Sequence, residues 1–358
     1  MVRSRFEPSA RTLDWTLFLV VALEAATGLV SLVSGRPSDA IVFTVHGVGG
    51  FVLTVLVLWK LRRVAPRVKS QVAGTRTTAF SLLLTVVTLA ALATGIFWVF
   101  GGDFRFLLWN ALNVHVALGL LLVPILLLHL RSHFHRPRQT DFTSRRTALQ
   151  YGALLVFGAL VWRVQQATNR LLSLPGASRR FTGSRERGSL AGNAFPLTSW
   201  VADDPDPIDI DAWTLSVTGL VGTPRTLAYD ELTLDAETRA VLDCTSGWYS
   251  DHDWQGVRVG SLLDLAESGQ NARWVSFRSV TGYRWSLPIA EARDALLATH
   301  VDGEPLAHGH GAPLRLVAPG RRGFQWVKWV TAVEVRETRD VSEWLAIFVS
   351  GFTDAPRE

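Results

Sequence analysis

Long apolar runs in the first half of the 358-residue chain restrict its possible folds more than any other feature. Each run is long enough to cross about 30 Å of hydrocarbon as a helix, and the fifth is the shortest. A bilayer admits only elements that satisfy their own backbone hydrogen bonds, so we expect residues 1–166 to form a five-span helical bundle. The runs lie at 13–33, 40–61, 79–100, 107–130 and 147–165.

The basic residues indicate how such a bundle is oriented. The formal net charge is +5, and the Lys and Arg residues gather beside the apolar runs, a pattern that does not suggest nucleic acid as a partner. They are concentrated at the amino terminus and in the loops after the second and fourth runs, whereas the two other loops are nearly neutral. The positive-inside rule then predicts a multi-pass protein of the cell membrane, with everything after the fifth run outside the cytoplasm.

Two of the histidines inside the apolar runs lie at similar depth, where imidazole is costly unless it is bound or paired. His46 and His115 lie roughly 9 and 12 Å from the outer ends of their runs, at about 1.5 Å of rise per residue. We predict that they supply both axial ligands of a b-type haem, for which Gly47, Gly49 and Gly50 would leave room. The alternative is a pair of hydrogen-bonded core histidines.

His129 follows His115 by fourteen residues. This spacing resembles the di-haem cytochrome b pattern, in which two helices each carry two histidines fourteen residues apart. The position fourteen residues after His46 is Lys60, however, and a protonated lysine is a poor haem ligand. We therefore expect one haem, and a second haem through His129 would lack its partner histidine.

The second half has the pattern of a water-facing domain. Residues 167–212 are a basic, Gly/Ser-rich linker and lead-in, and short alternating runs from residue 213 onward predict a mainly β, α+β domain over 213–358. We expect short helices at 229–233 and 289–298 and an irregular end at 339–358. The predicted strands are WTLSVTGLV, WVSFRSV, YRWSLPI, PLRLVAP and VTAVEVRE.

Three stretches of this half carry a resemblance. HGAPLRLVAPGRRGFQWVKWV at 310–330 and VLDCTSGWYSDHDWQGVRVGSLL around Cys244 resemble the molybdopterin domain of the sulfite oxidase family. Upstream, GNAFPLTSWVADDPDPID is similar to the segment that opens the pterin pocket in related membrane and periplasmic members. The resemblance implies a sulfite-oxidase-type molybdopterin oxidoreductase domain with Cys244 as the molybdenum ligand.

The chemistry of the residues agrees with this resemblance. Molybdenum is bound through soft sulfur, and Cys244 is the one cysteine of the chain. A buried, inert cysteine is the alternative. His310, Arg315 and Lys328 are donors suited to phosphate and pterin oxygens. The cofactor contacts that we assign are His310, Arg315, Lys328, Asn193, Phe195, Ser199 and Gln325, and the catalytic positions are Cys244, Trp248 and Tyr249.

The cysteine loop also bears on the substrate. Sulfite oxidases have an arginine five residues after the cysteine and a tyrosine near the end of the matching region, whereas this chain has Tyr249 and Val349 there. Trp248, four residues after Cys244, instead resembles the periplasmic methionine sulfoxide reductase catalytic subunits, which work with a separate haem-bearing membrane protein that takes electrons from quinol.

The resemblance implies a path from quinol through haem and molybdenum to an S-oxide or N-oxide substrate, either a small molecule or protein-bound. Two alternatives stay open. One is sulfite-oxidase-like oxidation that feeds electrons to the membrane, and the other is a non-catalytic, membrane-anchored binding module.

Paired arginines precede the fifth run. Ser144-Arg145-Arg146 followed by a modest apolar stretch resembles a twin-arginine export signal, which would suit a domain that must fold around its cofactor before crossing. The alternative is an ordinary positive-inside flank.

Overall fold

The computed structural model describes residues 9–70, 76–107, 109–134, 136, 138, 144–199, 203–234 and 236–350. The chain divides into two compact units, Met1–Ser184 and Arg185–Glu358. Of the linker expected at 167–212, the residues up to Ser184 cluster with the first unit and the rest with the second.

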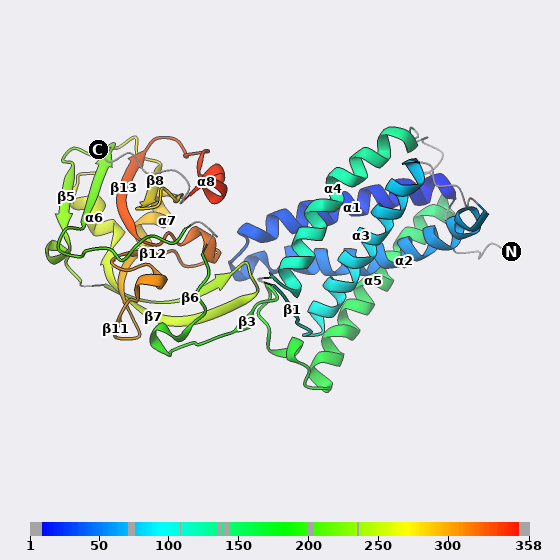
Figure 1. Cartoon of the computed structure of the whole chain (residues 1–358), viewed down its shortest axis with the longest axis horizontal. Coiled ribbons are helices and arrows are strands. Elements are labelled where there is room, and N and C mark those ends of the chain that lie inside the picture. Colours follow the sequence, from blue (N-terminus) through cyan, green and yellow to red (C-terminus); the bar gives the residue numbers. More distant parts are fainter. Residues whose placement is uncertain are drawn as a thin grey trace. The chain divides into compact units, whose positions relative to one another are not determined.

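The first unit contains five helices that are long and apolar enough to cross a membrane, so the chain is a multi-pass membrane protein, as its sequence predicts. Helix α1 packs along α2, α2 along α5, and α3 along α4 (Figure 1). The helices are α1 (Ala10–Val33), α2 (Ala40–Ser70), α3 (Arg76–Val99), α4 (Ala111–His133) and α5 (Arg145–Leu171).

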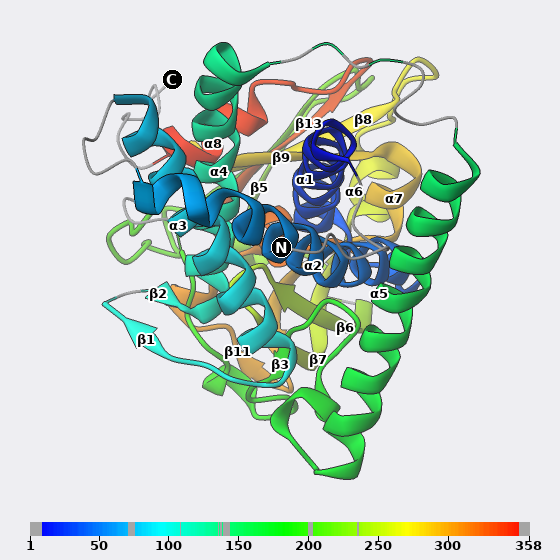
Figure 2. The same cartoon turned by 90° about the vertical axis from the view of Figure 1, so that its right-hand side faces the viewer.

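A small hairpin precedes α4, so the helix begins later in the sequence than the apolar run does. Strands β1 (Arg105–Phe106) and β2 (Trp109–Asn110) pair between α3 and α4, as Figure 2 shows. The Asn110 side chain then accepts the backbone N–H of Asn113 and caps the helix. Helix α4 therefore begins at Ala111 and not at 107, where the apolar run begins.

The second unit is built on two β-sheets. One contains β11, β10, β7 and β3, with β12 paired to β10 and β6 to β7, and the other has the order β5-β4-β13-β8-β9. Its strands are β3 (Arg185–Glu186), β4 (Thr214–Gly219), β5 (Arg225–Ala228), β6 (Ala236–Cys244), β7 (Trp248–Arg258), β8 (Trp274–Ser279), β9 (Arg284–Pro288), β10 (Leu296–Val301), β11 (Glu304–Pro305), β12 (Arg315–Val317) and β13 (Val330–Arg336).

Short helices connect these strands. The α-helices are α6 (Val259–Leu265), α7 (Ile289–Asp294) and α8 (Glu343–Val349). The short 3₁₀ helices include η4 (Gly192–Ala194), η5 (Tyr229–Glu231), η6 (His308–His310) and η7 (Gly323–Gln325). Each strand run predicted from the sequence is found as a strand, which confirms a β-rich domain after five apolar helices.

Two local predictions are wrong. The helix expected at 289–298 ends at Asp294, and Leu296–Val301 is strand β10. This strand is almost wholly buried, so it lacks the alternation that distinguishes a strand from a helix. The end expected to be irregular contains α8, and residues 351–358 lie outside the described part.

The core of the second unit joins both sheets. Among its largest fully buried side chains are Trp254 from β7, Trp285 from β9 and Trp326, which follows η7. The long hairpin of β6 and β7, visible in Figure 1, ends in the turn that carries Cys244. This packing gives the cysteine turn a rigid support.

Candidate functional site

The turn between β6 and β7 positions Cys244 beside Trp248. The two residues are cross-strand partners, separated by the three-residue turn Thr245–Gly247. Gly247 has a φ of 92° and donates its backbone N–H to the Cys244 carbonyl at 3.1 Å. Only glycine adopts this conformation without strain, so the sequence of the turn fixes the geometry of the pair.

A buried arginine holds this turn from the other side. Arg322 Nη1 lies 2.8 Å from the Asp243 carboxylate, and its Nη2 donates to the Cys244 carbonyl at 3.2 Å. Gly323 packs so closely that an added Cβ would lie 3.2 Å from the Cys244 Cα. The backbone of Cys244 is therefore fixed by an ion pair and a close backbone contact.

Cys244 faces a cavity of about 230 Å³. Of the predicted site residues, the structure brings Phe195, Ser199, Cys244, Trp248, His310, Arg315 and Lys328 to its wall. The remaining lining residues are Pro196, Thr198, Asp203, Leu242, Thr245, Tyr283, Gly323, Phe324, Trp326 and Ile347.

Arg315 is the buried cation of this cavity. Its Nη1 donates to the His310 carbonyl at 2.7 Å, its Nε has no hydrogen-bond partner, and it lies over the rings of Trp254 and Trp326. Burial lowers the pKa of Arg315 to about 10, and the nearby Cys244 opposes that shift. No described carboxylate forms an ion pair with it, so the site is suited to an anionic group.

Lys328 provides a second cation. Its Nζ donates to Ser199 Oγ and to the Gly309 carbonyl, both at 2.8 Å. Burial, followed by repulsion from Arg315, lowers the pKa of Lys328 to about 7. A phosphate here would favour the charged form of the lysine and gain a charge-assisted hydrogen bond.

His310 differs from the donor expected from the sequence. Its Nε2–H is already donated to the Asn193 carbonyl at 3.0 Å, and its ring stacks on Phe195 with centroids 3.7 Å apart. Burial and then Arg315 lower the pKa of His310 to about 4. The neutral ring therefore presents Nδ1 as an acceptor.

Asn193 supports this wall from behind. Its side chain donates to the Pro305 carbonyl at 3.0 Å and accepts the Ala307 N–H at 2.8 Å. Among the described contacts, the structure thus places Asn193 as a clamp between the lead-in segment and η6, outside the cavity lining.

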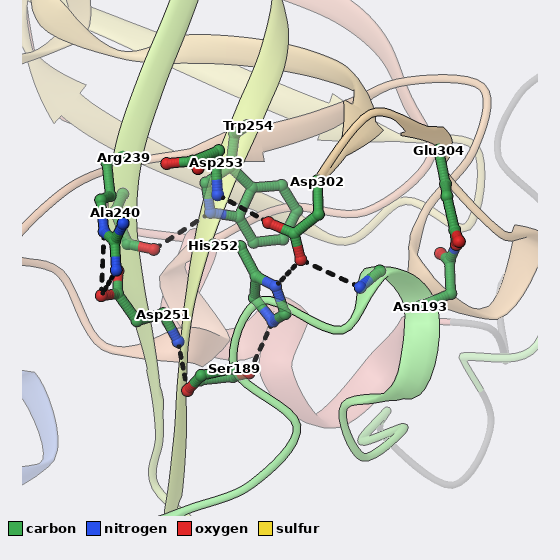
Figure 3. Close-up of polar contacts among 12 residues, drawn as sticks. Ser189, Asn193, Arg239, Ala240, Asp251, His252, Asp253, Trp254, Asp302 and Glu304 are labelled. Carbon is green, nitrogen blue, oxygen red and sulfur yellow. Dashed lines mark hydrogen bonds and ion pairs between the residues drawn. The ribbon is translucent and has the colours of Figure 1, made fainter.

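Hydrogen bonds that link Ser250 to His252 and His252 to Asp302 secure the same segment, and Figure 3 shows the contact between His252 and Asp302. The His252 Nδ1–H donates to Asp302 at 2.6 Å, and Asp302 also accepts the backbone N–H groups of Gly192 and Asp253. Ser250 and His252 are fully buried, so no substrate can reach the serine. Ser250, His252 and Asp302 have the residue types of a hydrolytic triad, but the burial of the serine excludes that role. Their hydrogen bonds instead attach the lead-in segment to β7.

Two further predicted residues lie away from the cavity lining in the described part of the chain. Gln325 is fully buried, and its Oε1 accepts the Arg322 N–H at 2.9 Å, which supports the arginine behind Cys244. Tyr249 follows Trp248 on β7, and successive strand residues point to opposite faces.

The lining residues that the sequence did not suggest come from many elements. Tyr283 donates its hydroxyl to the Phe324 carbonyl at 2.5 Å, and Ile347 comes from α8. Asp203 lies in the ADDPDP stretch of the lead-in segment, where its acidic neighbours resemble a solvated loop. In the sequence, an apolar or aromatic residue that lines a cavity looks like a core residue, and an acidic one in a loop looks like a surface residue. The sequence therefore does not identify such lining residues.

The intramembrane histidines meet within the first unit. The ring centroids of His46 and His115 lie 6.1 Å apart with an interplanar angle of 83°. His46 Nδ1 lies 3.1 Å from the Glu24 carboxylate, and His115 Nδ1–H donates to the Ala91 carbonyl at 2.9 Å. Both rings are thus held through Nδ1.

The glycines near these rings differ from the expectation. Gly47 packs against Trp162 and Gly49 against Glu24, so those positions accommodate protein side chains. Gly95 of α3 is the close neighbour of His115, where an added Cβ would lie 2.8 Å from the ring.

His129 and Lys60 have other contacts. The Ser81 hydroxyl lies 3.4 Å from His129 Nδ1, and Lys60 forms an ion pair with Asp14. Lys60, which stands where the di-haem pattern would have its fourth histidine, thus forms an ion pair with a protein carboxylate.

Comparisons with known proteins show the family to which the second unit belongs. Residues 202–344 match the family model of the oxidoreductase molybdopterin binding domain. The uncharacterized oxidoreductase YuiH of Bacillus subtilis is 30% identical over 156 residues, which cover 42% of this chain and 78% of YuiH. The chain belongs to this family of molybdopterin-binding oxidoreductases and is a molybdenum-dependent oxidoreductase.

Two other similar proteins have names that state an activity. The protein-methionine-sulfoxide reductase catalytic subunit MsrP of Xanthomonas campestris is 31% identical over 157 residues, which cover 38% of this chain and 49% of MsrP. The chain thus matches about half the length of that relative. The crystal structure of the sulfane dehydrogenase SoxCD of Paracoccus pantotrophus matches with 25% identity and a TM-score of 0.36, covering 38% of this chain and 41% of that one.

Proposed function

We propose that the chain passes electrons from quinol through one b-type haem to an extracytoplasmic molybdenum centre that reduces an S-oxide or N-oxide. The observation that carries this proposal is the cavity of the second unit, which the only cysteine of the chain lines together with the buried Arg315 and the half-buried Lys328. No described carboxylate forms an ion pair with Arg315. A soft thiolate with cations for an anionic pterin is the donor set that a molybdopterin needs.

The residues of the cavity have separate roles in this proposal. Cys244 binds the metal, Arg315 and Lys328 hold the anionic groups of the pterin, and Phe195 with His310 forms a flat wall. When bound, the molybdenum cofactor supplies two-electron oxygen-atom chemistry. Trp248 closes the cavity beside the cysteine and limits the access of water. Asn193 and Gln325 position His310 and Arg322.

The geometry of the histidine pair supports a haem. A metal–imidazole bond is about 2.0 Å long, so two imidazoles on opposite sides of one metal place their centroids about 6 Å apart. The observed 6.1 Å fits this requirement. Both Nδ1 atoms have partners, so each ring would bind the iron through Nε2. Contacts of this kind at the other ring nitrogen usually orient a histidine that binds a metal.

The oxide substrate rests on the similarity to MsrP and on the cavity itself. Sulfite oxidases hold a dianion with an arginine and a tyrosine, and this chain has Tyr249 and Val349 in their places. A neutral S-oxide or N-oxide does not need these two groups. The orientation rests on the positive-inside rule, which puts the second unit outside the cytoplasm.

The test uses the full chain purified in detergent. We expect one molybdenum and one low-spin haem per chain, and reduction of dimethyl sulfoxide, methionine sulfoxide or trimethylamine N-oxide by reduced viologen. His46→Ala and His115→Ala should each abolish the haem spectrum, while His129→Ala keeps most of it. A wild-type protein without haem, or loss of haem in His129→Ala alone, contradicts the electron path. A protein that holds molybdenum but reduces no oxide contradicts the substrate assignment.

A further inference from the structure

A buried carboxyl group lies in the cavity wall and has no role in holding the cofactor as described above. Asp203 is 7% exposed and lines the same cavity as Cys244. Its Oδ1 is buried and has no hydrogen-bond partner. A buried polar atom without a partner is costly, so a group that enters the cavity is expected to use it.

The surroundings of Asp203 favour its protonated form. Burial raises the pKa of Asp203, whereas a hydrogen bond from the Thr281 side chain and the charge of Lys328 lower it, and Asp204 raises it again. Tyr283 is the other titratable group facing it, and burial also raises the pKa of that phenol. The carboxyl group therefore keeps its proton to a higher pH than an ordinary aspartic acid does.

Reduction of an oxide consumes protons as well as electrons. For an S-oxide, the S–O bond breaks, sulfur gains an electron pair, and the oxygen leaves as water after taking up two protons. The two electrons come from the reductant, which is quinol in the proposed path or reduced viologen in an assay. A proton donor at the oxygen lowers the barrier most when its pKa is near the working pH.

The other titratable groups of the described lining are less suited to this task. His310 donates its Nε2–H to Asn193, and its lowered pKa leaves it neutral. Tyr283 donates its hydroxyl to the Phe324 carbonyl. Lys328 is bonded to Ser199 and Gly309, in a position to bind an anion.

We propose that Asp203 is a catalytic residue that donates a proton to the oxygen leaving the substrate. This assignment rests on the oxide reduction proposed above. Asp203 gives up its proton as the S–O or N–O bond breaks and regains one from solvent before the next turnover. It thereby adds an acid to a site whose cations are placed for the cofactor.

The experiment compares Asp203→Asn with the wild type at several pH values, using reduced viologen and one oxide substrate. We expect kcat to fall by roughly 10²–10⁴-fold, the range of general acid catalysis, while KM changes little. The wild-type kcat should decrease as pH rises through the pKa of Asp203, and the Asn variant should lose this pH dependence. Molybdenum content and unfolding temperature should stay as in the wild type.

Two further variants complete the test. Asp204→Asn removes an equal charge from the exposed neighbouring residue and should keep kcat at low pH and its pH dependence. The decrease of kcat should only move to a lower pH, because the charge of Asp204 raises the pKa of Asp203. Asp203→Glu keeps the acid and should restore part of kcat together with the pH dependence.

An Asp203→Asn variant with unchanged kcat overturns the assignment, and so does one that has lost molybdenum, because the carboxyl group would then bind the pterin. A wild type that holds molybdenum but reduces no oxide instead overturns the proposed function itself.

Discussion

Replacing Asp243 with alanine tests the support behind the cysteine turn. Asp243 and Arg322 are 2% and 4% exposed, and their charged atoms lie 2.8 Å apart. Removing one partner of a buried pair leaves the other charge uncompensated, which costs about 3–5 kcal/mol. A domain of this size loses roughly 2–4 °C per kcal/mol, so the unfolding temperature of the second unit should fall by roughly 6–20 °C.

The assay is thermal unfolding of the full chain in detergent, together with its molybdenum content. The matched control is Asp264→Ala, because Asp264 and Arg293 also form a 2.7 Å pair but are 69% and 40% exposed. An exposed pair contributes at most about 1 kcal/mol. Asp243→Ala should also lose molybdenum, since Arg322 donates to the Cys244 carbonyl.

The double variant Asp243→Ala with Arg322→Met removes both charges and should recover much of the lost stability. If Asp243→Ala lowers the unfolding temperature no more than Asp264→Ala does, the ion pair does not support the turn and the reasoning is refuted.

Three other predictions follow from the structure. Cys244→Ala should eliminate oxide reduction and leave the haem spectrum unchanged, and wild-type turnover in that variant would contradict the metal site. The pKa of Lys328 is about 7 in the folded protein and about 10.4 in the unfolded chain. Burial of the charged lysine therefore lowers the free energy of unfolding by its full amount below pH 7, and this loss disappears above about pH 10, where the lysine is neutral in both states. Cofactor-free protein should therefore gain stability as pH rises from 7 to 9, and a Lys328→Met variant with the same gain would exclude Lys328 as its source. Arg145→Lys with Arg146→Lys keeps the charge at the start of α5 but should leave the second unit in the cytoplasm, protected from external protease. External cleavage of that variant would show that the two arginines act only as topology anchors.

The sequence by itself determined the architecture of both halves. Apolar runs of about 20 residues have one stable state in a bilayer, so the five helices follow from length and composition. Cys244 and the residues from His310 to Lys328 could be singled out because the family resemblance that points to them lies within short stretches of chain. The alternating strands were predictable for the same reason, whereas the buried strand β10 was not, because burial on both faces removes the alternation.

Only the tertiary structure decided what each of these residues does. In the folded protein, the Nε2–H of His310 donates to the Asn193 carbonyl and Arg315 lies over tryptophan rings. Tyr249 points to the opposite face of β7 from Trp248. It also brought Asp203, Tyr283 and Ile347 from distant segments into one cavity wall. Burial and pairing set the protonation state of a charged group and the orientation of a ring. Both depend on residues far away along the chain, so they are decided only when the chain folds.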